Sequence, residues 1–236
     1  MTTSLPLIAS AAVSKKLEEK QRKRLAEHAR RAQRKRAAQR SNLLTVGIAG
    51  LVVVAVAALI ISDRRAQEDL APVPAGAAAQ DAGCGDVEKF DQVGRDHIDI
   101  GSEHEDYNSN PPTSGPHYGT PADAAFYPDA LPAEQLVHNL EHGQIVIWYR
   151  PDAPDETVDG IQALVEDANA KAVEAGAVEP LLAAPYDQLD GEFDYAVSAW
   201  TQSQSCVDYS TEAINDFRRE FQGRGPEGQG VPILGG

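Results

Sequence analysis

The longest apolar stretch of the chain is residues 43–61, LLTVGIAGLVVVAVAALII, in which Thr45 is the one polar side chain. As a helix, this stretch would span about 28 Å, close to the ~30 Å hydrocarbon core of a bilayer. A buried helix of a soluble protein seldom lacks a polar face over such a length. A cleaved signal peptide is the other alternative, with AGAAA at residues 75–79 as a cleavage site, but its apolar region is usually only about 7–15 residues long. The pattern therefore predicts a transmembrane helix over residues 43–62.

Helix and strand periodicities appear in the C-terminal half of the chain. The segment PAEQLVHNLEH at residues 132–142 predicts a short helix, with Pro132 suited to its first turn and Gly143 to its C-cap. The run QIVIWY that follows it predicts a buried strand. Further helices are predicted at residues 155–176 and 210–223, and further strands at 178–186 and 192–200. This order predicts an α+β fold, a small mixed sheet of three or four strands with flanking helices, preceded by one N-terminal transmembrane helix.

The segments between these elements set the expected boundaries. Residues 63–83 are rich in Ala, Pro and Gly without periodicity, which is typical of a linker. Proline and glycine also dominate the region before residue 132, and a long ordered loop of this kind usually carries function. We therefore expect a basic segment at 1–42, the membrane helix at 43–62, the linker at 63–83, the folded domain at 84–226 and a flexible tail at 227–236.

Charge is distributed unevenly along the chain. Residues 1–40 hold twelve Lys or Arg and three Glu, so the formal charge of −15 for the whole chain leaves −24 for the remainder. A basic segment next to a membrane helix predicts a cytoplasmic N-terminus and an extracytoplasmic C-terminal domain. The basic segment is expected to lie against anionic lipid of the inner leaflet. Nucleic-acid binding is not expected, because no aromatic residue interleaves the charges and no known motif is present.

The chain has two cysteines, Cys84 and Cys206, near the two ends of the region outside the membrane. In an oxidising compartment a disulfide between them is the simplest expectation. Two separate buried thiols are the alternative.

Candidate chemistry concentrates in the histidines, because five of the six lie within residues 97–142. His138 and His142 stand four apart on the predicted helix and so share a face, with Glu141 beside them. Imidazole ligands suit zinc and copper better than hard cations. The five histidines are His97, His104, His117, His138 and His142.

Other ligands of such an ion would come from the loop before the helix. His117 in PPTSGPHY is the first candidate, because prolines restrict the freedom that metal binding would otherwise remove. His97 is the second, whereas His104 lies between two glutamates and is most simply a solvated side chain. For His138 and His142 the structural alternative is a solvated helix end, where a histidine cation is favoured by the helix dipole.

HNLEH also fits the H-x-x-E-H pattern of zinc peptidases, in which the glutamate activates water. The match is short, and Gly143 would end the helix directly after the second histidine. No G-x-S-x-G motif, glycine-rich phosphate loop or dinucleotide fingerprint is present. Methionine is absent after Met1, which argues against a methionine-rich copper(I) carrier.

Three segments together resemble a family of bacterial membrane-anchored proteins known only as a domain of unknown function. They are RDHI, YNSNPPTSGPHY and LVHNLEHGQIVIWY, with a later AW…C…F pattern, over about residues 84–226. The resemblance implies a single-span anchor, an extracytoplasmic α+β domain and no settled activity. It also implies functional histidines at His97, His117, His138 and His142 with Glu141 beside them, whereas His104 does not match.

These observations predict a single-pass membrane protein whose extracytoplasmic domain binds one divalent transition metal, zinc or copper. The expected ligands are His117, His138 and His142, completed by His97 or Glu141. Two hypotheses stay open beside it: a metal-dependent hydrolase with Glu141 as general base, and a metal-free protein that binds a partner in the cell envelope.

Overall fold

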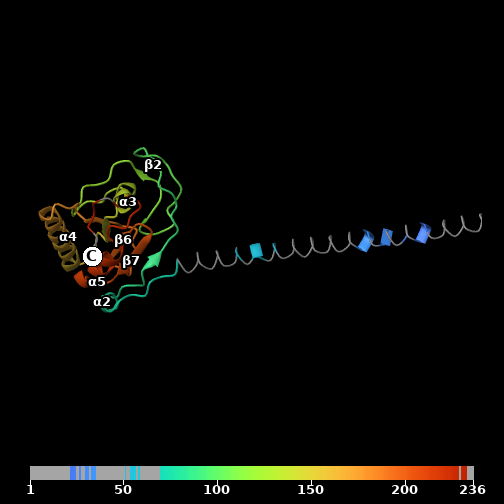
Figure 1. Cartoon of the computed structure of the whole chain (residues 1–236). Coiled ribbons are helices and arrows are strands. Elements are labelled where there is room, and N and C mark those ends of the chain that lie inside the picture. Colours follow the sequence, from blue (N-terminus) through green and yellow to red (C-terminus); the bar gives the residue numbers. More distant parts are fainter. Residues whose placement is uncertain are drawn as a thin grey trace, which may run out of the picture. The chain divides into compact units, whose positions relative to one another are not determined.

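The computed structural model describes residues 70–228 and 230–232, with scattered positions between residues 22 and 58. The chain divides into two compact units, residues 1–65 and 66–236, and the described positions of the first are helical (Figure 1). No helix among the described residues is long and apolar enough to cross a bilayer. The predicted span 43–62 is described only at residues 51, 54–56 and 58. The rest of it lies outside the described residues, so the transmembrane helix stays a prediction.

The second unit is built on a five-stranded mixed sheet with the order β1-β7-β6-β4-β5. The pair β4–β5 is parallel, and the other three pairs are antiparallel. The α+β prediction is confirmed, but the expected number of strands was too low. The sequence QSQSC of β7 has no apolar run, and β1 is only two residues long, so neither shows a strand pattern. The strands are β1 (Glu88–Lys89), β4 (Ile145–Tyr149), β5 (Leu181–Pro185), β6 (Tyr195–Ala199) and β7 (Gln202–Cys206).

Helices cover both faces of the sheet, and β4 shows how the sequence produces this arrangement. Its side chains alternate between faces, so Ile145, Ile147 and Tyr149 pack with α4 (Asp155–Glu174) and α5 (Thr211–Phe221). Val146 and Trp148 pack on the other side with α3 (Ala133–Glu141). Because both faces are buried, β4 reads as a continuous apolar run.

The segment at the start of the domain packs on the same body. Residues 73 and 87 exchange two backbone hydrogen bonds of 2.8 Å. The helix α2 (Ala77–Asp81) buries Ala79 against Ala213 of α5. Residues 70–83 belong to the segment predicted as a linker, and small alanine side chains let this part pack closely without any amphipathic pattern.

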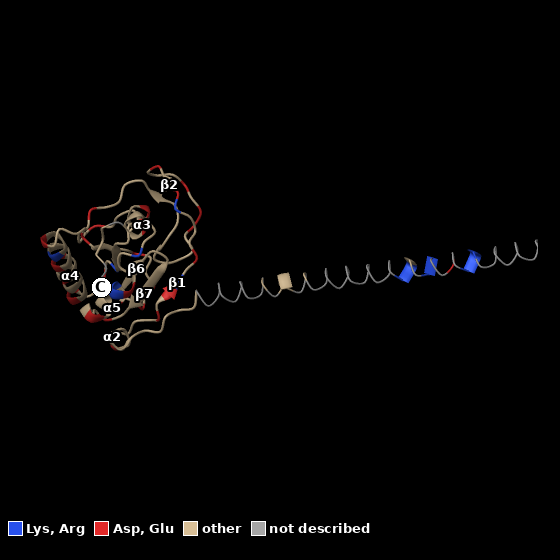
Figure 2. Ribbon diagram, viewed as in Figure 1, with Lys and Arg blue, Asp and Glu red and all other residues tan. Residues whose placement is uncertain are grey.

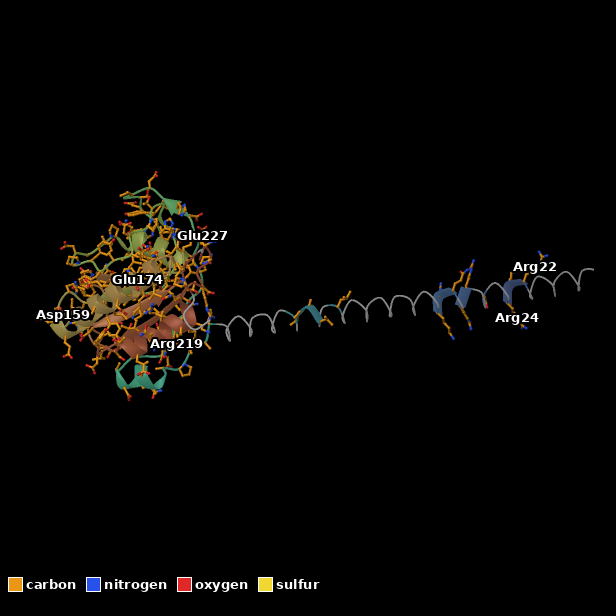
Figure 3. The ribbon with its side chains drawn as sticks, turned by 60° about the vertical axis from the view of Figure 1, so that its left-hand side comes forward. Arg22, Arg24, Asp159, Glu174, Arg219 and Glu227 are labelled. Carbon is orange, nitrogen blue, oxygen red and sulfur yellow. A yellow bond between two sulfur atoms is a disulfide. The ribbon has the colours of Figure 1, made fainter. Side chains whose placement is uncertain are left out.

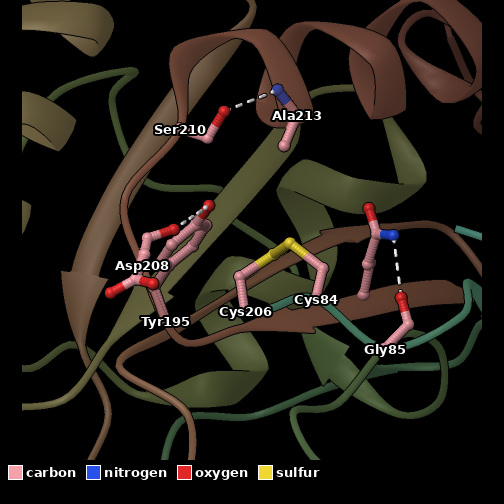
Figure 4. The surroundings of a disulfide bond; sticks show 8 residues. Cys84, Gly85, Tyr195, Cys206, Asp208, Ser210 and Ala213 are labelled. Atoms are coloured by element: carbon pink, nitrogen blue, oxygen red, sulfur yellow. Dashed lines mark hydrogen bonds between the residues drawn. A yellow bond between two sulfur atoms is a disulfide. The ribbon is translucent and has the colours of Figure 1, made fainter. Parts of the chain in front are cut away.

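The disulfide between Cys84 and Cys206 is confirmed, with an Sγ–Sγ distance of 2.01 Å (Figure 4). It joins the segment after α2 to the end of β7, across a sequence separation of 122 residues. Two nearby hydrogen bonds in the same view hold this region: Ser210 Oγ accepts from the backbone N–H of Ala213 at 3.2 Å as the N-cap of α5, and Gln204 donates to the Gly85 carbonyl at 2.9 Å.

Candidate metal centre

Four side chains meet at one face of α3. Two come from a short parallel sheet of β2 (His97–Ile98) and β3 (His117–Tyr118), in which His97 pairs directly with His117. The other two, His138 and Glu141, stand three apart on α3 and therefore share a face. One ligand atom from each of the four residues lies within 4.8 Å of the others. Figure 1 shows β2 beside α3, as this meeting requires.

Backbone carbonyl groups fix the protonation of two of these rings. His117 Nδ1 lies 2.8 Å from the Gly115 carbonyl oxygen, and His138 Nδ1 lies 2.5 Å from that of Tyr118. A carbonyl oxygen only accepts hydrogen bonds, so each Nδ1 must carry the proton. In a neutral ring the lone pair is then on Nε2. Nδ1–H donated to a backbone carbonyl is the usual support for a histidine that binds a metal through Nε2.

The Nε2 atom of His117 faces a carboxylate oxygen. It lies 3.0 Å from Glu141 Oε2, and both side chains are buried, with 0% and 1% exposed. A lone pair and a carboxylate oxygen repel each other at this distance, so either a proton, carried by His117 or by Glu141, or a metal ion has to lie between them. The geometry is therefore that of a shared cation site.

Glu141 has a second oxygen that lacks a partner. Among the described residues, Oε1 is buried and accepts no hydrogen bond. Among the described residues Arg95 forms an ion pair with it, but its Nε lies 3.9 Å away on a side chain that is 46% exposed. A buried carboxylate oxygen without a donor is costly and needs an explanation. Metal coordination of the carboxylate would supply it.

His97 and Trp200 enclose the buried pair from opposite directions. The His97 ring stacks on that of His138 with 4.9 Å between centroids, and its side chain is 52% exposed. Its Nε2 lies 3.9 Å from Glu141 Oε2. The ring of Trp200 makes an edge-to-face contact with that of His117, with 6.3 Å between the ring centroids. The site is thus closed by an aromatic side chain on the inside and reaches solvent at His97.

One comparison with known proteins gives a match. The model of a family described as "Protein of unknown function (DUF3105)" matches residues 100–232, more than half of the chain. The chain belongs to the DUF3105 family. No curated protein and no solved structure matches it.

The DUF3105 match contains three of the four clustered residues, His117, His138 and Glu141, while His97 lies just before it. The resemblance to an uncharacterised domain family is thereby confirmed. The family description assigns no activity, so the chemistry of this DUF3105 domain has to be argued from its own residues.

His142 lies beside the four-residue cluster, not within it. The helix α3 ends at Glu141, and His142 is its C-cap with φ −76° and ψ 0°. Its Nε2 is 3.1 Å from His138 Nε2 and 3.8 Å from Glu227 Oε2. His142 and Glu227 are 39% and 51% exposed, so this pair forms the solvent-facing edge of the site. His142 thus contacts His138, but the group of ligand atoms that lie within 4.8 Å of one another contains Glu141 and not the predicted ligand His142.

Glu227 is the residue that the sequence pattern did not reveal. The segment after α5 returns to the end of α3, where the Glu227 N–H donates to the Glu141 carbonyl at 2.9 Å. This approach depends on Gly225, because a Cβ atom there would overlap the Glu141 carbonyl oxygen. Glu227 is labelled in Figure 3. It lies in the part of the chain predicted as a flexible tail, and only the pair of glycines around Arg224 hinted at close packing.

Burial acts on His138 in the direction that favours metal binding. The pKa of His138 is lowered from 6.5, chiefly by burial, against an opposing effect of the Tyr118 carbonyl. Positive charge on His142, His117 or His97 lowers the pKa of His138 further. His138 is therefore mainly neutral at pH 7, and its Nε2 lone pair faces His142 Nε2 at 3.1 Å.

His104 takes a different position from the solvated one expected. Its side chain is only 15% exposed, with Nε2 3.3 Å from Glu134 Oε1 in the first turn of α3. Its Nδ1 donates to the Glu105 carbonyl at 2.7 Å. His104 thus attaches the loop to the start of α3 and lies outside the cluster.

Proposed function

We propose that this protein binds one divalent transition metal ion through His97, His117, His138 and Glu141, for metal handling or as a structural ion. The observation that carries the proposal is the position of Glu141: one carboxylate oxygen lies 3.0 Å from His117 Nε2, and the other is buried without a donor. Three imidazoles and one carboxylate form a complete shell for a four-coordinate ion. Zinc and copper(II) suit these donors better than magnesium or calcium.

The required rearrangement is small. Zinc bonds of about 2.0–2.1 Å to nitrogen and oxygen in a tetrahedral shell place ligand atoms about 3.3 Å apart. The largest separation among the four ligand atoms is 4.8 Å. The side chain of His97 is half-exposed and so is the freest of the four to move, while the other three residues are buried on β3 and α3.

Placement of the domain outside the cell is part of the same proposal and is supported by separate features. Leu51, Val54 and Val56 are helical and expose large apolar side chains, as a membrane helix would toward lipid. The disulfide supports an oxidising compartment. Figure 2 shows acidic residues on α4 and on the loops of the domain, opposite in sign to the arginines and lysines of the N-terminal segment. Those basic residues would contact anionic inner-leaflet lipid.

Two other functions compete with this proposal. A hydrolase with Glu141 as general base needs its carboxylate beside a metal-bound water and outside the ligand shell, whereas Glu141 lies within the group of ligand atoms. If the protein bound only a partner in the envelope and no metal, the buried Glu141 Oε1 would lack a hydrogen-bond donor for no evident reason. Metal content measured together with ligand geometry separates all three.

The test uses the full-length protein purified in a mild detergent. After chelator treatment and loading with zinc or copper(II), elemental analysis should find about one equivalent of metal, and X-ray absorption should show three imidazole ligands. His117→Ala should abolish retention. His104→Ala is the matched control, because it removes a partly buried histidine outside the cluster. A protein that retains no metal and binds none on titration contradicts the proposal.

A further inference from the structure

A groove lies on the other face of the sheet, between α4 and α5. Its volume is about 560 Å³, within the range of about 300–1,000 Å³ that is usual for sites of small organic ligands. The lining from α4 and the residues after it is mostly apolar but includes Asp167 and Lys171, and α5 contributes hydroxyl, amide and guanidinium groups. The apolar lining is Leu164, Ala168, Ala172, Ala177 and Pro180, and the polar wall is Asn215, Arg218 and Gln222.

Arg218 is the unusual member of this lining. It is only 6% exposed. Its Nε donates to Gln222 Oε1 at 2.9 Å, and one terminal nitrogen donates to Asn215 Oδ1 at 2.7 Å. Both partners are neutral amides. Within the described part of the chain, no carboxylate lies at ion-pairing distance from this guanidinium.

The other two cations of the groove differ from Arg218 in this respect. Lys171 pairs with Asp167 at 2.6 Å, and Arg219 pairs with Asp216. Both are largely exposed, and Arg219 is labelled in Figure 3. Arg218 is therefore the buried cation of the groove that forms no ion pair, since the nearby Asp167 pairs with Lys171 instead.

A buried charge without a counter-charge is costly to a fold. Burial lowers the pKa of Arg218 to about 10, and Asp167 opposes this effect from a distance. The guanidinium stays charged at neutral pH. Its two amide partners hold it in place on the groove wall, so it is ready to receive one negative charge next to an apolar surface.

We propose that the groove between α4 and α5 binds a small organic monocarboxylate with an apolar body. The carboxylate pairs with Arg218, and the apolar body lies against the alanine-rich face of α4. A single unbalanced cation suits a single negative charge, and the apolar wall excludes a fully polar anion such as phosphate. The site is separate from the histidine cluster, because α3 covers the opposite face of the sheet.

The test is isothermal titration calorimetry of the full-length protein with 4-phenylbutyrate, in the same detergent on both sides. The neutral 4-phenylbutan-1-ol and acetate serve as ligands that lack the charge or the apolar body. 4-Phenylbutyrate should bind at least tenfold more tightly than either. Arg218→Gln should weaken its binding about tenfold to a hundredfold, the usual effect of losing a charge-assisted hydrogen bond. Arg224→Gln, which removes an exposed arginine outside the groove, should leave affinity within about twofold.

A second variant keeps the proposal testable if Arg218→Gln does not fold. Ala175 is exposed and lines the groove, so Ala175→Phe should fill it and abolish binding with Arg218 intact. Equal affinity for the acid and the alcohol, or no effect of Ala175→Phe, overturns the proposal. It is also overturned if binding appears only after deletion of residues 233–236, because the groove would then belong to the end of the chain itself.

Discussion

His117 Nε2 and Glu141 Oε2 lie 3.0 Å apart, with both side chains buried and with the Nδ1 proton of His117 donated to the Gly115 carbonyl. The pair comes from two elements, β3 and α3, that meet only in the folded domain. Two explanations fit this contact: a metal ion shared with His97 and His138, or only a proton shared between His117 and Glu141. They predict different effects of metal when the carboxylate charge is removed.

Glu141→Gln distinguishes the two explanations. If the contact is a metal site, the variant should bind zinc or copper(II) more than tenfold more weakly. Metal should then raise the free energy of unfolding of the wild-type protein more than that of the variant, because a ligand that binds only the native state stabilises it more the tighter it binds. Chemical denaturation of the metal-free and metal-loaded forms measures both quantities.

A proton-bridged ion pair gives a different pattern. Breaking a buried pair by removing one partner costs about 3–5 kcal/mol, so the metal-free variant would be strongly destabilised and metal would have no effect on either protein. Glu134→Gln, the same substitution in the first turn of α3 but outside the cluster, controls for general effects on the helix.

His138→Ala and His142→Ala should differ, although the two histidines look equivalent in the sequence. His138 belongs to the four-residue cluster, so its loss should abolish tight metal binding. His142 lies at the exposed edge, 3.8 Å from Glu227, so its loss should reduce affinity less than tenfold. Titration of both variants with a chromophoric metal chelator as competitor tests this, and equal losses would place His142 in the shell.

Part of the site could be predicted from patterns in a few consecutive residues. The proline-rich loop marked His117, and the helix pattern marked His138 and Glu141, because each of these signals is contained in a few consecutive residues. The assignment of His142 as a ligand depended on the helix continuing through it. The helix ends one residue earlier, so a spacing of three, from His138 to Glu141, presents the side chains that face His117.

Contacts between distant segments are what the sequence did not show. The pairing of β2 with β3 involves two residues from each strand, too few for any periodicity. The polar strand β7 is in the sheet because β6 and β1 lie on either side of it. Glu227 reaches the end of α3 only through the close approach of Gly225, which no local pattern predicts.

Alkaline pH should unfold the domain through its buried tyrosines. Burial, followed by Asp129, raises the pKa of Tyr149 to about 12 from its ordinary 10.0, and its hydroxyl donates to the Tyr127 carbonyl at 2.6 Å. A pKa raised by folding means that the protonated form is favoured in the native state. This contribution is complete below pH 10 and is lost as pH rises toward 12.

Denaturant unfolding of the metal-free protein at pH 9, 10 and 11 should therefore give a falling free energy, and Tyr149→Phe should make the fall less steep. Absorbance at 295 nm should show that the tyrosines of the folded protein ionise at a higher pH than those of the unfolded chain. A stability that is constant over this range would show that the tyrosines ionise without cost.

Replacement of the disulfide tests how much the covalent link contributes. The link spans 122 residues, and loss of a native disulfide of this kind typically costs about 2–5 kcal/mol. We expect Cys84→Ser combined with Cys206→Ser to lower the unfolding free energy by this amount while the far-ultraviolet circular dichroism is kept. An unchanged unfolding free energy would mean that the packing of α2 against α5 holds this region alone.

Gly225→Ala should loosen the edge of the histidine site without touching any ligand. A Cβ atom on residue 225 would lie 2.5 Å from the Gly143 nitrogen and would also overlap the Glu141 carbonyl, so the segment that carries Glu227 must move away. The expected cost is about 1–3 kcal/mol, as for overpacking elsewhere, with faster metal exchange because Glu227 leaves His142. Gly191→Ala is the control, since a Cβ atom there meets nothing within 4 Å. If both variants match the wild-type protein in unfolding free energy and in metal exchange rate, residues 223–228 do not hold the end of α3 in solution.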